Sequence, residues 1–398
     1  MKGVSLNELG REKISNNSSI PHSPASVVVF RADASLDIGS GHIMRCLTLA
    51  DSLVERGVEC HFICREHQGH LIEAITARDI VVHRLPINEL ENGAVSEPQA
   101  GDISHAQWLG ASWQQDAAAS RPLIEQLKPD WLVVDHYALD ARWQDAVLPS
   151  GCHTGAKLLV IDDLADRPHR ADLLLDQNLG RKSSDYASLV PMQCRMLIGA
   201  HYALLRPEFA ELRSWSLARR RNARFKRLLI SLGGVDKDNA TGQLLEALNK
   251  CDLPSDIQIS VVMGATAPWQ ETVKKQAESM HWPTEVVVNV SDMARRMAEA
   301  DIAIGAAGST SWERCCLGLP TLMLVLAENQ QPIAQALEKA GVAICLGTPD
   351  QLDGLACELA ALQQPGNLQA MSNVAARATA GEGVATLCYA MFPQEAAQ

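Results

Sequence analysis

The sequence predicts an α/β protein in which two Rossmann-like domains face each other across an interdomain cleft. Short β-branched runs alternate with stretches whose apolar residues recur at helical spacing, the pattern of parallel strand–helix–strand units. This alternation starts afresh after an arginine-rich stretch at residues 219–224. A chain of 398 residues, 47% of them apolar, is also long enough for two domains to bury separate cores.

The first domain is expected at residues 25–215. Helical spacing predicts a helix from 43 to 54, and apolar runs predict strands at 27–30, 58–64, 131–134, 158–161 and 173–175. Residues 1–24 are polar and without periodicity, so we expect a flexible leader. Residues 88–119 lack a regular pattern and are interpreted as an insertion or a mobile loop.

The second domain is expected at residues 226–398. A helix is predicted to begin at Asn239, and another to end at Gly318 and Pro320, residues that stop helices. Apolar runs predict strands at 228–232, 257–263, 286–290, 302–304 and 321–326. The last helical stretch is expected near the C-terminus, in the sequence GEGVATLCYAMF.

Composition narrows the class of ligand. The net charge of −12 and the pI near 5.5 argue against a nucleic-acid surface, which needs a positive field. No apolar run approaches the length of about 20 residues that spans a bilayer, and no signal peptide is visible at the N-terminus. We therefore expect a cytoplasmic protein that binds a small molecule, without a membrane or nucleic-acid partner.

The cysteines and histidines do not predict a metal centre. The 11 cysteines are scattered along the chain, as reduced core thiols are. One segment has the residue density of a zinc site, but its cysteines lie on a predicted strand whose alternation already explains their burial: Cys60, His61, Cys64, His67 and His70. No metal and no cofactor are expected.

The sequence RADASLDIGSGHIMR carries the first candidate site. Ligands of doubly wound sheets bind beyond the carboxyl ends of the strands, and this segment follows the first strand. Gly39 and Gly41 permit a tight turn that delivers His42 to the first turn of a helix, where a neutral imidazole could act as a general base. The third glycine of a dinucleotide fingerprint is absent after Gly39 and Gly41, so NAD binding is disfavoured. The alternative is that the glycines only shape the turn and His42 caps the helix.

Polar side chains follow three further strands of the first domain, at residues 135–137, 162–163 and 176–178. Together they would surround one crevice suited to a hydroxylated ligand such as a sugar. Two alternatives stay open: the aspartates cap the helices that follow, or they bind a divalent metal, although nothing in the sequence fixes their mutual geometry.

Two small-residue loops in the second domain predict a diphosphate site. Residues 305–313, with the sequence GAAGSTSWE, and residues 231–234, with the sequence SLGG, each follow a strand. Small residues let backbone amides approach phosphate oxygens, and hydroxyls add donors. The candidate UDP-binding residues are Gly233, Gly234, Gly308, Ser309, Thr310, Ser311 and, for a ribose, Glu313. Taken alone, Glu313 could equally be a charge that complements a helix dipole.

These motifs, in order, resemble one family. The segments are RADAS, GSGHIMRCLTLA, VVDHYALD, DLLLDQNLG, SDYASLVP, YALLRPEF, SLGG and GAAGSTSWERCCLGLP. They are similar to those of the UDP-2,4-diacetamido-2,4,6-trideoxy-β-L-altropyranose hydrolases of pseudaminic acid biosynthesis. The likeness runs from about residue 27 to the C-terminus. That family in turn resembles the GT-B glycosyltransferases, notably the lipid II N-acetylglucosaminyltransferase, so a GT-B-like fold is implied.

The resemblance implies roles for individual residues. His42 corresponds to the family's catalytic histidine, which activates water for metal-independent hydrolysis of a UDP-sugar with inversion. Gly41, Tyr137, Arg206 and Asn329 fall where that family contacts the sugar and the phosphates, and Glu313 falls where it holds the ribose. Two other functions remain open: a GT-B glycosyltransferase that passes the sugar to an acceptor, and a non-catalytic nucleotide-sugar binding module.

Overall fold

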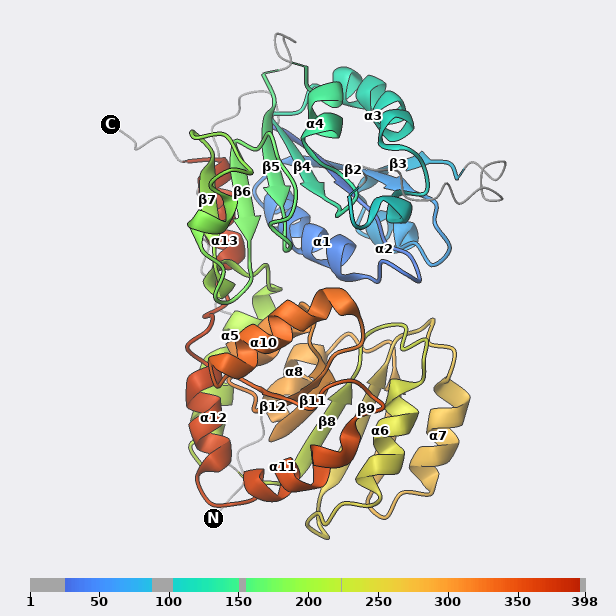
Figure 1. Ribbon diagram of the computed structural model, residues 1–398, viewed down its shortest axis with the longest axis vertical. Helices are drawn as coiled ribbons and strands as arrows, with labels where there is room; N and C mark the ends of the chain where they lie inside the picture. The colour runs from blue at the N-terminus through green and yellow to red at the C-terminus, as the bar shows by residue number, and fades with distance from the viewer. Residues whose placement is uncertain (1–25, 88–102, 150–154, 223, 394–398) are drawn as a thin grey trace.

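Two parallel β-sheets, one in each half of the chain, form the framework of the molecule (Figure 1). The computed structural model describes residues 26–87, 103–149, 155–222 and 224–393. The leader predicted at residues 1–24 and residues 88–102 of the predicted insertion lie outside this described part. The α/β class with two Rossmann-like domains is confirmed.

The first sheet has the strand order β3-β2-β1-β4-β5-β6-β7, and every neighbouring pair is parallel. Its strands are β1 (Val27–Ala32), β2 (Glu59–Arg65), β3 (Val81–Leu85), β4 (Trp131–Asp135), β5 (Lys157–Ile161), β6 (Leu173–Asp176) and β7 (Arg195–Ile198). Strand β1 lies in the middle, between β2 and β4, so the loop after it opens near the centre of the sheet edge. This position suits a ligand site at the topological switch point.

Helices cover both faces of the first sheet, as the apolar runs of its strands require. One core packs α1 (Gly41–Val54) and α2 (Ile72–Thr76) against the sheet, and the other packs α3 (Trp113–Leu127) and α4 (Ala141–Val147). Short 3₁₀ turns complete the domain: η2 (Ala106–Leu109), η3 (Ser183–Tyr186) and η4 (Ala200–Tyr202).

The second sheet repeats this plan with the order β10-β9-β8-β11-β12-β13, again all parallel. Its strands are β8 (Arg227–Ser231), β9 (Gln258–Met263), β10 (Thr284–Val288), β11 (Ile302–Ala306), β12 (Thr321–Leu324) and β13 (Ile344–Cys345). Helices α6 (Ala240–Leu248), α7 (Gln270–Glu278) and α11 (Leu355–Leu362) contribute to the core on one face. The opposite core includes α8 (Met293–Glu299), α9 (Thr310–Cys316), α10 (Gln331–Lys339) and α12 (Asn367–Ala375). The turns η5 (Glu328–Gln330) and η6 (Leu352–Gly354) lie between these elements.

The last helix of each domain packs against the other domain. The predicted ranges 25–215 and 226–398 did not include this exchange. Helix α5 (Pro207–Arg220) packs Phe209 into the core of the second domain. Helix α13 (Gly383–Met391) buries Leu387 in the core of the first domain, beside α1 (Figure 1). The chain therefore connects the domains twice, and each domain contributes one helix to the other.

A substitution at Leu387 tests how much the packing of α13 against the first domain stabilises that domain. Its side chain is fully buried, whereas Tyr389 on the same helix is 57% exposed. We expect Leu387→Ala to lower the free energy of unfolding by roughly 2–5 kcal/mol, as cavities at buried leucines do. Tyr389→Ala is the control and should change it by less than about 0.5 kcal/mol. Urea unfolding followed by tryptophan fluorescence suits the test, because the Trp131 Nε1 donates to the Met391 carbonyl at 3.1 Å. Equal effects of the two variants would contradict the docking of α13.

Most predicted strands are present with shifts of one or two residues, but the strands β3, β7 and β13 were missed and helix α3 was misassigned. The edge strand β3 carries His83 and Arg84, which break up its apolar run. Helix α3 lies partly inside the stretch predicted to be irregular, so that interpretation of residues 113–119 was wrong. Strand β7 was not predicted at all. None of the helices in the described ranges has the length and apolar character needed to cross a membrane.

Candidate functional site

The loops that follow β1 and β11 meet in the cleft between the domains. A Cβ built on Gly41 would lie 3.6 Å from the Ser309 Oγ, and one built on Gly234 would lie 3.8 Å from the Ser40 Oγ. The turn that carries His42 thus lies directly opposite the two small-residue loops of the second domain. The predicted catalytic residue and the predicted UDP-binding loops are brought together at one place.

His42 is held by a buried carboxylate. Its Nδ1 lies 2.6 Å from the Asp135 Oδ1, and both side chains are almost completely buried. Because a carboxylate only accepts hydrogen bonds, the proton of a neutral imidazole resides on Nδ1 and Nε2 keeps its lone pair. This pairing orients His42 to act as a base. A histidine that only capped the helix would not need a carboxylate partner. Helix α1 has no side-chain cap at Ser40, and His42 lies inside the helix.

Asp135 stays ionised because it also pairs with Arg45. The Arg45 Nε donates to the Asp135 Oδ2 and one terminal nitrogen donates to the Oδ1, each at 2.6 Å. Burial alone would raise the pKa of Asp135, but the charge of Arg45 and the neighbouring His42 hold that pKa well below its usual range. The carboxylate is therefore available to stabilise a positive charge on His42.

The predicted polar strand ends converge on Asp163. Its Oδ2 accepts from Arg45 at 2.6 Å and from the Tyr137 hydroxyl at 2.9 Å. The Asn178 amide donates to the Asp163 carbonyl at 3.0 Å. Tyr137 is only 7% exposed, so its hydroxyl is engaged within the first domain and its ring is what faces other groups.

The other two strand-end aspartates are occupied by protein groups. The Tyr186 hydroxyl lies 2.9 Å from the Asp162 Oδ2 and 2.8 Å from the Asp176 Oδ2. Burial and the nearby charge of Asp163 raise the pKa of Asp176 to about 7, although the Arg181 guanidinium at 2.7 Å opposes this rise. Among the described residues no group of three or more His, Cys, Asp or Glu has a geometry that could hold a metal ion. That finding includes the segment with Cys60 and His67.

The Gly305–Ser311 loop of the second domain is supported from below by a buried arginine. Arg314 donates to the Ala306 carbonyl at 2.7 Å and contacts the hydroxyls of Thr310 and Ser311 at 3.0 Å. Gly305 is required at its position because a Cβ there would lie 2.5 Å from the guanidinium. In the described part of the chain Arg314 forms no ion pair with a carboxylate. Its positive charge therefore acts on the loop that it contacts. The Ser311 amide donates to the Gly308 carbonyl, so it is not available to a phosphate.

The loops after β8 and β9 also touch. Gly264 follows β9, and a Cβ at this position would lie 1.9 Å from the Gly234 carbonyl oxygen. A side chain there would push the two loops apart. Gly233 has a φ of +95°, which favours glycine. The glycines predicted to bind phosphates thus also permit the close approach of the loops that form the site.

Glu313 and Arg206 face each other across a small cavity of about 50 Å³, which is also lined by Gly41 and Arg45. Burial raises the pKa of Glu313 to about 7, although the charge of Arg206 opposes this rise. Arg206 forms an ion pair with Glu208 at 2.8 Å. Ligand sites usually measure roughly 300–1,000 Å³, so a nucleotide sugar requires the cleft to be wider here.

Asn329 lies in η5, at the start of α10 and next to Gln330. A Cβ on Gly308 would lie 3.8 Å from the Gln330 Nε2, so η5 adjoins the phosphate-loop region. The structure therefore groups every predicted site residue around the cleft. Asp135 and Asp163 were predicted only as polar strand ends, without their partners, and the sequence reasoning gave Arg45 and Arg314 no part in the site.

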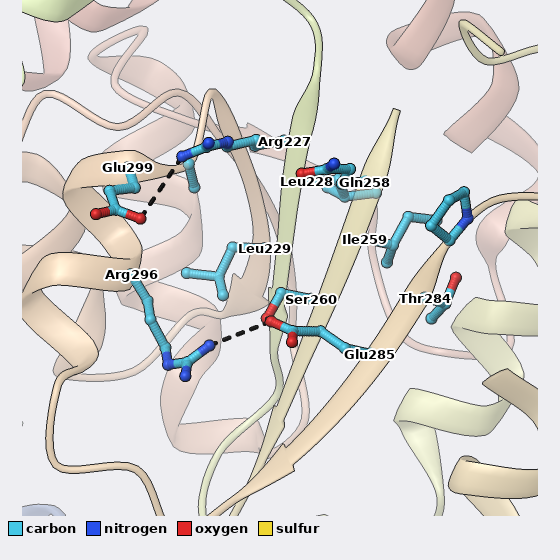
Figure 2. A pocket seen from close by; sticks show the side chains of 12 residues that line it. Arg227, Leu228, Leu229, Gln258, Ile259, Ser260, Thr284, Glu285, Arg296 and Glu299 are labelled. Carbon is cyan, nitrogen blue, oxygen red and sulfur yellow. Dashed lines mark hydrogen bonds and ion pairs between the residues drawn. The ribbon is translucent and has the colours of Figure 1, made fainter. Parts of the chain in front are cut away.

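Two larger cavities need to be distinguished. One, of about 770 Å³, lies between the domains and is lined by Asp37 and Trp108 from the first domain and by Lys237 and Thr266 from the second. The other, of about 670 Å³, lies at the amino ends of β8, β9 and β10 (Figure 2). Ligands of such sheets bind at the carboxyl ends, so the second cavity is remote from the site. Its charged side chains pair with each other, Arg296 with Glu285 at 3.2 Å and Arg227 with Glu299 at 3.6 Å (Figure 2).

Comparison with solved structures decides the architecture. MurG from Acinetobacter baumannii aligns over 92% of this chain and 99% of that chain, with a TM-score of 0.65 at 16% identity. The chain has the GT-B fold. The UDP-GlcNAc 2-epimerase from Neisseria meningitidis, solved with UDP-GlcNAc bound, aligns over 92% of this chain and 98% of its own, with a TM-score of 0.56 at 13% identity.

Sequence comparison confirms the resemblance that the motifs predicted. The chain is 28% identical over 314 residues to the UDP-2,4-diacetamido-2,4,6-trideoxy-β-L-altropyranose hydrolase of Campylobacter jejuni, covering 79% of this chain and 97% of that protein. Residues 232–387 match the family described as glycosyltransferase family 28 C-terminal domain. In this GT-B protein that match begins just after β8 and includes both small-residue loops except Ser231.

Proposed function

We propose that this GT-B protein is a UDP-sugar hydrolase. The substrate would be a UDP-linked 2,4-diacetamido-2,4,6-trideoxyhexose, and the products would be the free sugar and UDP, in pseudaminic acid biosynthesis. The likeness to the Campylobacter jejuni hydrolase supports the choice of substrate. The pairing of His42 with Asp135 supplies a base that can take a proton from an attacking hydroxyl, and the likeness to the hydrolase favours water as the source of that hydroxyl.

In the proposed reaction His42 takes a proton from a water molecule through Nε2. The water oxygen attacks the anomeric carbon on the face opposite the diphosphate, and the bond from that carbon to the UDP oxygen breaks. The configuration at the anomeric carbon is therefore inverted. The imidazolium that forms is stabilised by Asp135, whose charge is maintained by Arg45.

The leaving UDP needs positive charge rather than a proton, since a diphosphate is already a good leaving group. Arg206 lines the cavity beside the phosphate loops, and Arg314 lies behind the Thr310 and Ser311 hydroxyls. Together with the amides near Gly308 they would stabilise the developing negative charge. These groups would do the work of a metal ion, so we propose a metal-independent step.

The observation that carries this proposal is the 2.6 Å contact that orients His42 toward base function. The test is to incubate the protein with the UDP-linked diacetamido sugar alone and to measure UDP release. We expect catalytic release without any added acceptor. Release only after addition of an acceptor would favour a glycosyltransferase, which the family 28 match also supports. Binding without release under either condition would favour the non-catalytic module.

Glu313 predicts a pH dependence of substrate binding. As a carboxylate it would accept hydrogen bonds from the ribose hydroxyls, but in the free protein burial raises its pKa to about 7. Below that pH the site binds a proton that the ligand must displace, so affinity should fall as pH falls. From pH 8 to pH 5.5 we expect Kd for the UDP-sugar to rise by roughly tenfold to thirtyfold, as expected for one group with this pKa. The UDP-sugar is the suitable ligand, since its phosphodiesters do not titrate in this range.

Glu313→Gln is the matched control for that experiment. The amide still accepts one hydrogen bond from the ribose, but it does not titrate. Its Kd should be nearly constant across the same pH range. An unchanged pH dependence in Glu313→Gln would mean that another group is responsible.

A further inference from the structure

We propose that His105, which precedes the 3₁₀ turn η2, and Trp108, which lies within that turn, form the sugar-recognition wall of this site and select an N-acylated deoxy sugar. The inference rests on the proposed function and deepens it. We call this pair the aromatic turn. It belongs to the part of the chain for which the sequence predicted no site residues.

The aromatic turn is packed onto the residues around His42. The Trp108 and Tyr137 rings are stacked with centroids 5.8 Å apart, and the His105 ring lies 5.4 Å from Tyr137 and 4.4 Å from Trp108. Tyr137 in turn meets the His42 ring edge-on at 4.6 Å. A continuous row of rings therefore leads from the proposed base to the aromatic turn.

This row of rings also faces the second domain. Trp108 lines the interdomain cavity of about 770 Å³, opposite Lys237 and Thr266. His105 lies close enough to Glu328, the neighbour of Asn329, for that charge to act on it. Burial lowers the pKa of His105, Asp166 and Glu328 oppose that effect, and Arg167 and His42 reinforce it. His105 is thus a neutral donor or acceptor between the two lobes.

The chemistry of the wall matches one class of sugar. Trp108 is only partly buried, so part of its indole is left for a ligand. A pyranose that lacks the C6 hydroxyl and carries acetamido methyls has apolar surface that an indole can cover. Around the same cavity Asp37, Gln68 and Lys237 supply groups that hydrogen-bond to hydroxyls and amides. The volume lies within the usual range of ligand sites, roughly 300–1,000 Å³.

The experiment compares the sugar-dependent part of binding with the UDP-dependent part. KM for the UDP-linked diacetamido sugar and the inhibition constant of UDP are measured for wild type, Trp108→Ala, Trp108→Phe and His105→Ala. The control is Trp215→Ala, since Trp215 is 50% exposed on α5 and outside the site. Thermal unfolding of each variant checks that it is folded. Calorimetric Kd values for the same two ligands are measured in parallel, so that the test does not depend on turnover.

For Trp108→Ala we expect the affinity for the UDP-sugar to fall by roughly tenfold or more, while that for UDP changes less than about twofold. Trp108→Phe should recover most of the loss, and His105→Ala should show a smaller loss of the same kind. Equal weakening of both ligands, or no change in their ratio, would overturn the aromatic turn as a sugar wall. If wild type binds the sugar but releases no UDP, the proposed function fails while the binding ratio still tests the wall.

Discussion

His42→Asn is expected to reduce kcat for UDP release by roughly two to four orders of magnitude, the usual contribution of a general base. The affinity for UDP should change little, because the diphosphate is expected to bind to the loops of the second domain. Turnover should fall because an asparagine can still donate to Asp135 but cannot take a proton from water. Steady-state kinetics and UDP inhibition measure the two effects separately.

His281→Asn is the matched control for this prediction. His281 is exposed, and its ring packs edge-on against the ring of the adjacent Trp282. Its kcat should remain within about twofold of wild type, as for most surface changes. Near-native turnover in His42→Asn would show that the water is activated by another group or that the reaction is not hydrolysis.

Asp135→Asn is expected to reduce kcat by up to about 10⁴-fold with little change in KM. The amide cannot stabilise the imidazolium and can hold His42 in the wrong tautomer. Because Asp135 acts through His42 and not on the diphosphate, the affinity for UDP should be retained while kcat falls. This split separates a positioning role from simple loss of structure, which would weaken binding and turnover together.

Asp163→Asn serves as the control for Asp135. Asp163 also accepts a hydrogen bond from Arg45, but no contact joins it to His42 in the described structure. We expect a loss in kcat of less than about tenfold and an unchanged affinity for UDP. An effect of Asp163→Asn equal to that of Asp135→Asn would mean that the buried network acts as a whole, not through the His42–Asp135 pair.

The strand–helix alternation was enough to predict the two sheets, because parallel strands that are buried on both faces have continuous apolar sequences. It could not predict which core the terminal helices would join. Nothing in the sequences of α5 and α13 indicates which sheet they cover, and only the packing of Phe209 and Leu387 shows that each helix joins the other domain. Helix α3 was missed because its exposed face is rich in alanine and polar residues, with Pro122 inside it.

For the site, the sequence could place His42 and the small-residue loops at strand ends, but it could not pair side chains. Asp135 lies 93 residues from His42, and its role depends on β4 lying beside β1. Arg45 was given no role in the site by the sequence, yet it maintains the charge of Asp135. The signal that could have identified it is its helical spacing from His42, which puts both side chains on one face of α1.

The central claim is that His42 directs water to the anomeric carbon of a UDP-sugar. It is tested most directly by running the reaction in ¹⁸O-labelled water and examining both products, with proton NMR to identify the first anomer formed. The account predicts that UDP carries no label, that the label enters the sugar, and that the first anomer is inverted. Label in the terminal phosphate of UDP would show that the phosphorus–oxygen bond is cleaved instead, and a retained anomer would require a covalent intermediate. Either result would contradict the mechanism.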